Sequence, residues 1–282
     1  MAYKLSRELS CATKWNTKND LLNNLVVQPL FCEFYRFINV KFKDPNLLAQ
    51  ALCHSSFAYG KRENGIEDNE RLEFLGDSEF GSYVTSRLYE KFPNMSEGEL
   101  SKFRAALISE ESLNEIGALL NLSNLLLVGR NLAGQNYKPS PGIVSSAFEA
   151  IVGAIIKDQG VEKGRLLLDE LFYRIKYQFG IYFWDLKKLH EFDAKTRLQE
   201  ETVRHLKETP QYESRKLDNQ TFEVALKFRD QILLTTQDVS KKKAERKLAQ
   251  RALLEKLYLM YVPLDDKTAT DIVMADIQNN AS

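Results

Sequence analysis

Acidic side chains between residues 67 and 79 are the first candidates for chemistry. This segment holds six acids and a single base, Arg71. On a helix, three of the acids, Glu70, Glu73 and Asp77, fall within about 60° of one another. Like charges at such spacing repel unless a cation compensates them, and Mg²⁺ suits this role because it takes oxygen ligands from a few carboxylates, water and substrate phosphate. Spacing alone leaves two interpretations open, a metal site and a solvated acidic face.

The neighbours of two of these acids are apolar. Glu73 and Asp77 lie within the run Leu-Glu-Phe-Leu-Gly-Asp at residues 72–77. A solvated face is uniformly polar, whereas this run alternates carboxylates with large apolar side chains. The context therefore favours the metal site.

Helical periodicity dominates the chain from about residue 30 to residue 180. Phe31, Phe34, Phe37 and Ile38, for example, recur at helical spacing. No alternating strand pattern occurs before residue 190. The sequence therefore predicts an all-helical domain that positions the acids.

A smaller domain of different character follows. An amphipathic helical pattern begins at residue 193, Phe222, Val224 and Leu226 then alternate with polar neighbours, and a last helical pattern begins at Ser240. Helix, about three strands and helix make a small α+β domain. The predicted boundaries are an N-terminal extension (1–28), a helical domain (29–180), a linker (181–192), an α+β domain (193–260) and a polar tail (261–282).

The composition narrows the class of protein. The 282 residues include 39 Lys and Arg against 39 Asp and Glu, so overall positive charge does not attract nucleic acid here. Three scattered cysteines suggest neither a disulfide framework nor zinc, and no run of 18 apolar residues predicts a membrane span. The N-terminus lacks the apolar centre of a secretory signal, which leaves open a weak organelle-targeting interpretation and an ordinary polar lead-in. We predict a cytoplasmic protein with no membrane partner.

Residues Asn69–Ser78 (NERLEFLGDS) resemble the signature helix of the ribonuclease III family, the endonucleases of double-stranded RNA. Similar segments follow in family order: ALCHSSF (51–57), EGELS (97–101) and AFEAIVGA (147–154). The resemblance covers roughly residues 30 to 260. It implies an all-α ribonuclease III endonuclease domain followed by an α-β-β-β-α double-stranded-RNA-binding domain. The resemblance implies that the protein is a hydrolase, which cleaves double-stranded RNA to process rRNA or mRNA precursors.

The resemblance also assigns roles to individual acids. Glu73, Asp77 and Glu149 match the metal-site carboxylates of the family, with Asp77 and Glu149 in the catalytic positions. Glu70 and Glu97 match outer acidic positions. The implied cofactor is Mg²⁺, with Mn²⁺ as a substitute, which would activate a water and neutralise the scissile phosphate.

A homodimer is the implied assembly. Phe74 matches the aromatic position that packs across the dimer interface in the family. A position in the core of its own domain is an equal alternative for this side chain on sequence alone.

The sequence departs from the family pattern at the second pair of acidic residues that the family has. The family has an Asp three residues before the second Glu, and here Ser146 precedes Glu149 at that spacing. A hydroxyl orients a metal-bound water but supplies no charge. Two explanations stay open: a divergent enzyme that works with the remaining carboxylates, or a catalytically impaired dimer that binds double-stranded RNA or the ribosome. The intact Glu73 and Asp77 favour the enzyme.

Residues 193–200 and 240–253 resemble the two ends of a double-stranded-RNA-binding domain. Residues 240–256 hold seven bases and two acids, a local net charge of +5. Lys241, Lys242 and Lys243 at a helix N-terminus suit phosphates, and Gln199 matches a position that approaches the minor groove. A solvated basic helix is the alternative, which the surrounding layout disfavours. The loop 216–221 lacks the Gly-Pro-x-His type of sequence common in such domains, so we predict a lower affinity than is typical.

Overall fold

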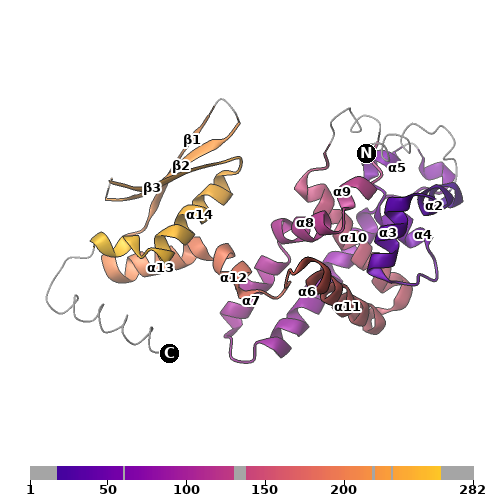
Figure 1. Cartoon of the computed structure of the whole chain (residues 1–282), viewed down its shortest axis with the longest axis horizontal. Coiled ribbons are helices and arrows are strands. Elements are labelled where there is room, and N and C mark those ends of the chain that lie inside the picture. The colour runs from indigo at the N-terminus through magenta and orange to yellow at the C-terminus, as the bar shows by residue number, and fades with distance from the viewer. Residues whose placement is uncertain (1–17, 60, 130–137, 218–219, 230, 262–282) are drawn as a thin grey trace. The chain divides into compact units, whose positions relative to one another are not determined.

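The structure is a computed structural model, and it describes residues 18–59, 61–129, 138–217, 220–229 and 231–261 (Figure 1). The chain divides into two compact units, Met1–Asp185 and Leu186–Ser282. The described part contains no helix with the length and apolar character needed to cross a membrane.

The first unit is built from helices. They are α2 (Lys18–Val26), α3 (Pro29–Ile38), α4 (Asn46–Ala51), α5 (Ser55–Ala58), the 3-10 turn η1 (Arg62–Asn64), α6 (Glu70–Lys91), α7 (Glu97–Leu107), α8 (Glu110–Leu119), α9 (Leu122–Leu125), α10 (Pro141–Gln159) and α11 (Val161–Phe179).

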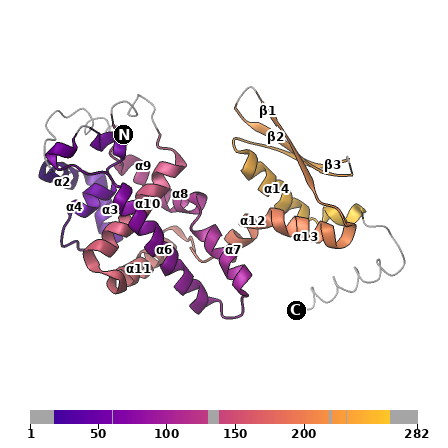
Figure 2. The same ribbon diagram turned by 180° about the vertical axis from the view of Figure 1, so that it is seen from behind.

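Helix α10 is the centre of this unit. The Ser140 hydroxyl accepts a hydrogen bond from the Ile143 backbone N–H, and Pro141 occupies the first turn, which together define where the helix begins. Buried side chains project from most sides of α10, and it packs against α4, α6, α8 and α11 (Figure 2). A helix that is apolar all round belongs in a core.

An aromatic cluster joins α6, α11 and the segment that follows. Phe80 and Tyr83 of α6 lie near Phe172 of α11, and the Phe172 ring stacks on Phe183 at 4.1 Å between centroids. Trp184 is buried in the same cluster, 4.9 Å from the Phe183 ring. These rings hold the far half of α6 to the rest of the unit.

The folded part of the first unit begins earlier than predicted. Residues 18–26, assigned from the sequence to an extension ending at residue 28, form α2. Leu21 and Leu25 are buried, and α2 packs against α4 and α3. The polar residues around these two leucines concealed a short amphipathic helix. Residues 1–17 lie outside the described residues.

The second unit contains a three-stranded antiparallel sheet in the order β1-β2-β3. Its elements are α12 (Leu186–Phe192), α13 (Ala194–Leu206), β1 (Gln211–Lys216), β2 (Phe222–Phe228), β3 (Gln231–Asp238), α14 (Lys241–Leu254) and the 3-10 turn η2 (Leu257–Tyr261). In the sheet, Val224 lies opposite Ser214 on one side and Thr236 on the other.

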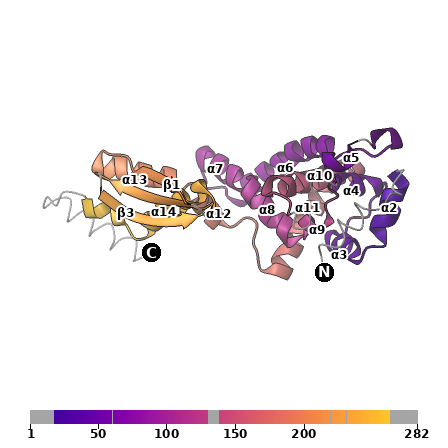
Figure 3. The ribbon, with the colours of Figure 1, turned by 90° about the horizontal axis from the view of Figure 1, so that it is seen from above.

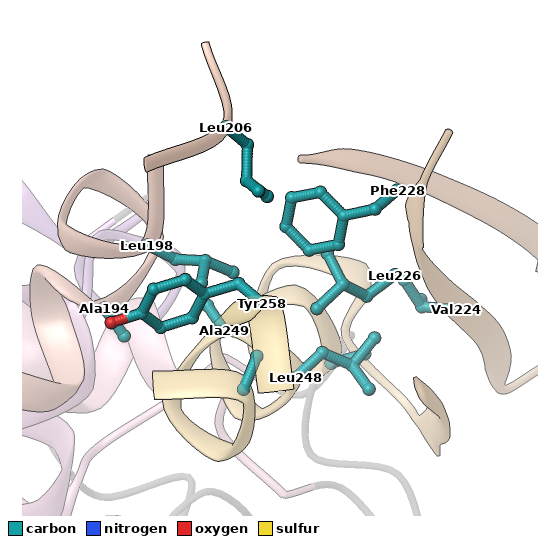
Figure 4. Packing of buried hydrophobic residues seen from close by; sticks show 11 residues of the cluster. Ala194, Leu198, Leu206, Val224, Leu226, Phe228, Leu248, Ala249 and Tyr258 are labelled. Carbon is teal, nitrogen blue, oxygen red and sulfur yellow. The ribbon is translucent and has the colours of Figure 1, made fainter. Parts of the chain in front are cut away.

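The core of the second unit lies between the sheet and helices α13 and α14. Val224, Leu226 and Phe228 alternate along β2 and point toward Leu198 and Leu248 (Figure 4). This alternation was the strand signal in the sequence. Helix α12 occupies the second half of the predicted linker 181–192, because Leu189 is buried and Phe192 lies under the Arg246 guanidinium at 4.8 Å.

Candidate active site and RNA-binding surface

Helices α6 and α10 touch through their backbones at a pair of glycines. A Cβ atom added to Gly76 would lie 1.8 Å from the carbonyl oxygen of Glu149, and one added to Gly153 would lie 2.0 Å from a carbonyl oxygen of α6. Only glycine leaves room for such an approach. The two helices lie side by side in the view from above (Figure 3). The crossing therefore fixes the turn of α6 that carries Glu73 and Asp77 beside the turn of α10 that carries Glu149.

Three carboxylates from these two helices share one electrostatic environment. Burial raises the pKa of the half-buried Glu149 to about 7, with further contributions from Asp77 and then Glu73. Nearby like charges disfavour the ionised form of a carboxyl, as burial does. Asp77 is exposed and Glu73 is half-buried. A carboxyl perturbed by specific charged neighbours is typical of functional sites.

The predicted outer acids lie at the starts of helices α6 and α7. Glu70 is exposed in the first turn of α6. Glu97 is the first residue of α7, where its carboxylate accepts a hydrogen bond from the Ser101 hydroxyl at 2.9 Å. Neither acid is among the residues that shift the pKa of Glu149 in the described part of the chain.

The RNA-binding candidates lie on two helices of the second unit. Lys241, Lys242 and Lys243 form the exposed first turn of α14, and the Ser240 hydroxyl accepts a hydrogen bond from the Lys243 backbone N–H at 3.4 Å. Gln199 is exposed on α13. Free N–H groups at a helix N-terminus and ammonium groups both attract phosphate, so this turn of α14 is a good anion site.

A buried acid links these two helices. Glu245 of α14 accepts a hydrogen bond from Lys195 of α13 at 2.6 Å and lies 3.9 Å from Lys241. The Lys195 ammonium also lies 4.7 Å above the ring of Tyr212 in β1. Burial, and then Glu245, raises the pKa of the Tyr212 phenol. The contact holds the basic starts of α13 and α14 in a fixed relation.

Two family models match the chain, ribonuclease-III-like over residues 44–174 and double-stranded RNA binding motif over residues 194–256. A protein named Ribonuclease 3 from Desulfotalea psychrophila is 37% identical over 230 residues, which covers 78% of this chain and 90% of that relative. Ribonuclease 3 from Bdellovibrio bacteriovorus is 38% identical over 217 residues, covering 76% and 90%. The chain belongs to the ribonuclease III family. It is a ribonuclease III-type endoribonuclease of double-stranded RNA, a hydrolase.

Solved structures of similar chains include a nuclease domain and a Dicer. The nuclease domain of ribonuclease III from Campylobacter jejuni is 38% identical, with a TM-score of 0.46, and covers 53% of this chain and 98% of its own; its description concerns a region involved in dimer formation. Dicer from Pichia stipitis is 25% identical, with a TM-score of 0.35, and covers 76% and 95%.

The predicted family and fold class are thereby confirmed. The ribonuclease III domain is helical, and the double-stranded-RNA-binding domain has the predicted α-β-β-β-α order in α13, β1, β2, β3 and α14. Its basic helix is therefore part of an RNA-binding motif rather than an unrelated solvated helix.

Ser146 lies on α10 one helical turn before Glu149 and is half-buried. Residues three apart on a helix share a face. Ser146 is therefore on the side of α10 that carries Glu149, and its match to a carboxylate position of the family stays a prediction.

Phe74 is 81% exposed, next to Glu73 on α6. The alternative that it packs in the core of its own domain is wrong. A lone exposed apolar side chain is ordinary on a protein surface, so the place of Phe74 in a dimer interface stays a prediction.

The carboxylate oxygens of the candidate active site suit a hard divalent cation that keeps some of its water ligands. Among the described residues, no group of three or more His, Cys, Asp or Glu side chains is placed so that it could hold a metal ion by itself. Mg²⁺ does not need such a group, because it keeps several waters and binds through one or two carboxylates plus phosphate. Asp77 and Glu149, which come from two helices and act on one another electrostatically, fit that smaller requirement.

The sequence analysis did not predict the hydrogen bonds that hold the second half of α6, away from the turn that carries Glu73 and Asp77. Asp169 of α11 accepts hydrogen bonds from the Tyr83 hydroxyl at 2.9 Å and from both Nε and Nη2 of Arg87, at 2.9 and 2.5 Å. More than 80 residues separate Asp169 from these partners along the chain, so no local pattern predicts the contact.

Proposed function

We propose that this chain hydrolyses phosphodiester bonds of double-stranded RNA with Mg²⁺, or Mn²⁺ in its place, held by Glu73, Asp77 and Glu149. The observation that carries the proposal is the close backbone crossing of Gly76 and Gly153, across which Asp77 and Glu73 add to the effect of burial in raising the pKa of Glu149. Carboxylates that repel one another across two helices are stabilised when a cation binds between them. The location of the protein in the cytoplasm and its role in processing rRNA or mRNA precursors remain predictions.

Different residues of the chain have different roles in the proposed hydrolysis. Glu73, Asp77 and Glu149, the last without its proton, would hold the metal ion with their carboxylates. The metal ion would supply activation of a water and stabilisation of the leaving oxyanion. The Ser146 hydroxyl orients a water on the same side of α10. Lys241–Lys243 bind phosphates of the duplex, whose A-form shape such domains recognise through the minor groove and the backbone.

Long duplex RNA incubated with the purified chain tests the proposal. We expect cleavage that requires Mg²⁺, stops with a chelator and leaves 5′-phosphates. Asp77→Asn removes a cation-binding charge while keeping the shape, and it should abolish cleavage. Cleavage by the wild-type chain that does not exceed the Asp77→Asn background would reject the proposal.

A catalytically impaired RNA-binding dimer is the second candidate function. The observation in its favour is Ser146, which leaves the site one negative charge short of the family pattern. It predicts duplex binding without Mg²⁺-dependent cleavage, so the same experiment decides between the two.

Replacing Ser146 by aspartate tests how the site has adapted. We expect the Mg²⁺ concentration for half-maximal cleavage to fall about tenfold or more, since groups that support a metal site commonly change affinity by 10–100-fold. Ser146→Ala is the matched control, and it should lower the rate by removing the hydroxyl without adding charge. Unchanged Mg²⁺ dependence in Ser146→Asp would show that residue 146 does not influence the cation.

We expect Phe74 to lie in a homodimer interface. Phe74→Asp places a charge where an aromatic ring would be buried, so sedimentation should show a shift from dimer to monomer. The exposed Tyr177 of α11 offers a control, because Tyr177→Asp changes an equally exposed aromatic residue away from the signature. A wild-type chain that sediments as a monomer would refute the dimer.

A further inference from the structure

A buried acid lies between the two basic helix starts of the double-stranded-RNA-binding domain. Glu245 of α14 is buried, and its side chain is only 11% exposed. One of its oxygens accepts a hydrogen bond from Lys195 of α13 at 2.6 Å, and the other lies 3.9 Å from the Lys241 ammonium. A glutamate is buried almost only when it is paired, so these three residues form one unit, here called the lysine–glutamate triad.

The lysine–glutamate triad keeps a positive charge that solvent can reach. Two ammonium groups share one carboxylate, so the net charge of the triad is positive. The side chains of Lys195 and Lys241 are 41% and 52% exposed. An ammonium group has three donors, and Glu245 takes one of those of Lys195. The triad is therefore suited to accept an anion from the solvent side.

An aromatic ring also holds the Lys195 ammonium. This group lies 4.7 Å from the centre of the Tyr212 ring in β1, and a cation at such a distance is attracted by the ring. Fixing a free lysine side chain in one conformation costs entropy. Because Glu245 and Tyr212 already fix Lys195 in the folded domain, this cost does not oppose the binding of a ligand.

The lysine–glutamate triad lies between the two RNA-binding candidates of the domain. Lys195 is four residues before the exposed Gln199 on α13, so the two side chains share one face of that helix. Lys241 begins α14, the candidate phosphate site. Domains of this kind contact minor grooves of the duplex and the phosphates of the major groove between them. A cation between a minor-groove helix and a phosphate-binding helix is well placed for a backbone phosphate.

We infer that Glu245, although it is an acid, raises the affinity for duplex RNA by holding Lys195 and Lys241 where a backbone phosphate binds between them. Glu245 is thus a positioning residue, and Lys195 is a further phosphate contact. A count of charges predicts the opposite effect, because an acid close to RNA repels its phosphates. This inference rests on the proposed binding of duplex RNA by the chain.

Replacing Glu245 by glutamine in the full-length chain tests the inference, with a chelator present so that the RNA stays intact. At about 0.1 M salt we expect Glu245→Gln to bind duplex RNA about three- to tenfold more weakly than the wild type. The slope of log affinity against log salt should fall by about 1, as for one lost phosphate contact. Partial unfolding would weaken binding and leave this slope unchanged.

Glu255→Gln is the matched control for Glu245→Gln. Glu255 pairs with Arg251 at 2.8 Å at the other end of α14, and its side chain is 46% exposed. Because exposed pairs contribute little, this variant should change the affinity by less than about twofold. Equal or tighter binding by Glu245→Gln, or weaker binding with the wild-type slope, would overturn the inference.

The same substitution in a Lys195→Met background should have the opposite effect. Without Lys195, the Glu245 carboxylate repels the phosphates more than it positions a cation, so adding Glu245→Gln should tighten binding about two- to fivefold. Weaker binding in both backgrounds would show that Glu245 acts through the fold alone and would overturn the inference. A wild-type chain that binds no duplex RNA would reject the proposed function together with the inference, whereas binding that Glu245→Gln leaves unchanged would reject the inference alone.

Discussion

Replacing Gly76 by alanine is expected to remove about 2–4 kcal/mol of unfolding free energy from the nuclease unit and to abolish cleavage. The added Cβ would lie 1.8 Å from the Glu149 carbonyl oxygen and 2.8 Å from the Gly153 nitrogen. Both are backbone atoms, so no side-chain rotation relieves the clash. Helices α6 and α10 must separate, which moves Asp77 away from Glu149.

Gly81 of the same helix is the matched control. A Cβ at Gly81 meets nothing within 4 Å, so Gly81→Ala should stabilise α6 by roughly 0.5–1 kcal/mol through helix propensity. Denaturant unfolding followed by the fluorescence of Trp184 reports on this unit, since Trp184 is buried against Phe183. Equal stability of the Gly76→Ala and Gly81→Ala variants would contradict the backbone contact.

The sequence predicts the helix that carries Glu73 and Asp77 but not the partner of that helix. Gly76 and Gly153 are 77 residues apart, and each alone resembles any glycine within an apolar helix. Their meeting is a property of tertiary packing, as is the bracing of Arg87 by Asp169. Local patterns fix local structure, whereas the distance between carboxylates on two helices depends on how closely the helices pack.

Phe74 illustrates a different limit. An aromatic residue inside an apolar run fits either a core or an interface, because both bury apolar surface. Its sequence neighbours could not decide between them, whereas its 81% exposure excludes the core of its own domain. The short helices α2 and α12 were missed for a related reason, since two buried leucines in α2 and one in α12 are too few for a periodic signal.

Glu149 is expected to make the metal-free nuclease unit less stable as pH rises. Its pKa is about 7 in the folded chain against a reference value of 4.5, so the folded state holds this proton more tightly than the unfolded state. Stability from this group is present below about pH 4.5, declines as pH rises from there to about 7, and is lost above that. Because the carboxyl is only partly buried, we expect the decline to be about 1–2 kcal/mol.

Replacing Glu149 by glutamine separates this stability effect from catalysis. The neutral amide keeps the shape, removes the cost of burying a charge and also removes the repulsion by Asp77 and Glu73. Without metal at pH 8, Glu149→Gln should therefore unfold at higher denaturant concentration than the wild type, while its cleavage rate falls by at least about 100-fold. Mg²⁺ should stabilise the wild type at pH 8 by binding the folded state and leave the variant nearly unchanged.

The half-buried Glu79 of α6 provides the control for the Glu149 variant. Glu79 is not among the residues that raise the pKa of Glu149, so Glu79→Gln should change stability by less than about 0.5 kcal/mol at either pH and keep the response to Mg²⁺. Equal stabilities of wild type and Glu149→Gln at pH 8 would mean that neither burial nor the neighbouring carboxylates penalise a charge on Glu149. A cation would then gain nothing by binding among them, so this one comparison tests the electrostatic basis of the site without any measurement of RNA cleavage.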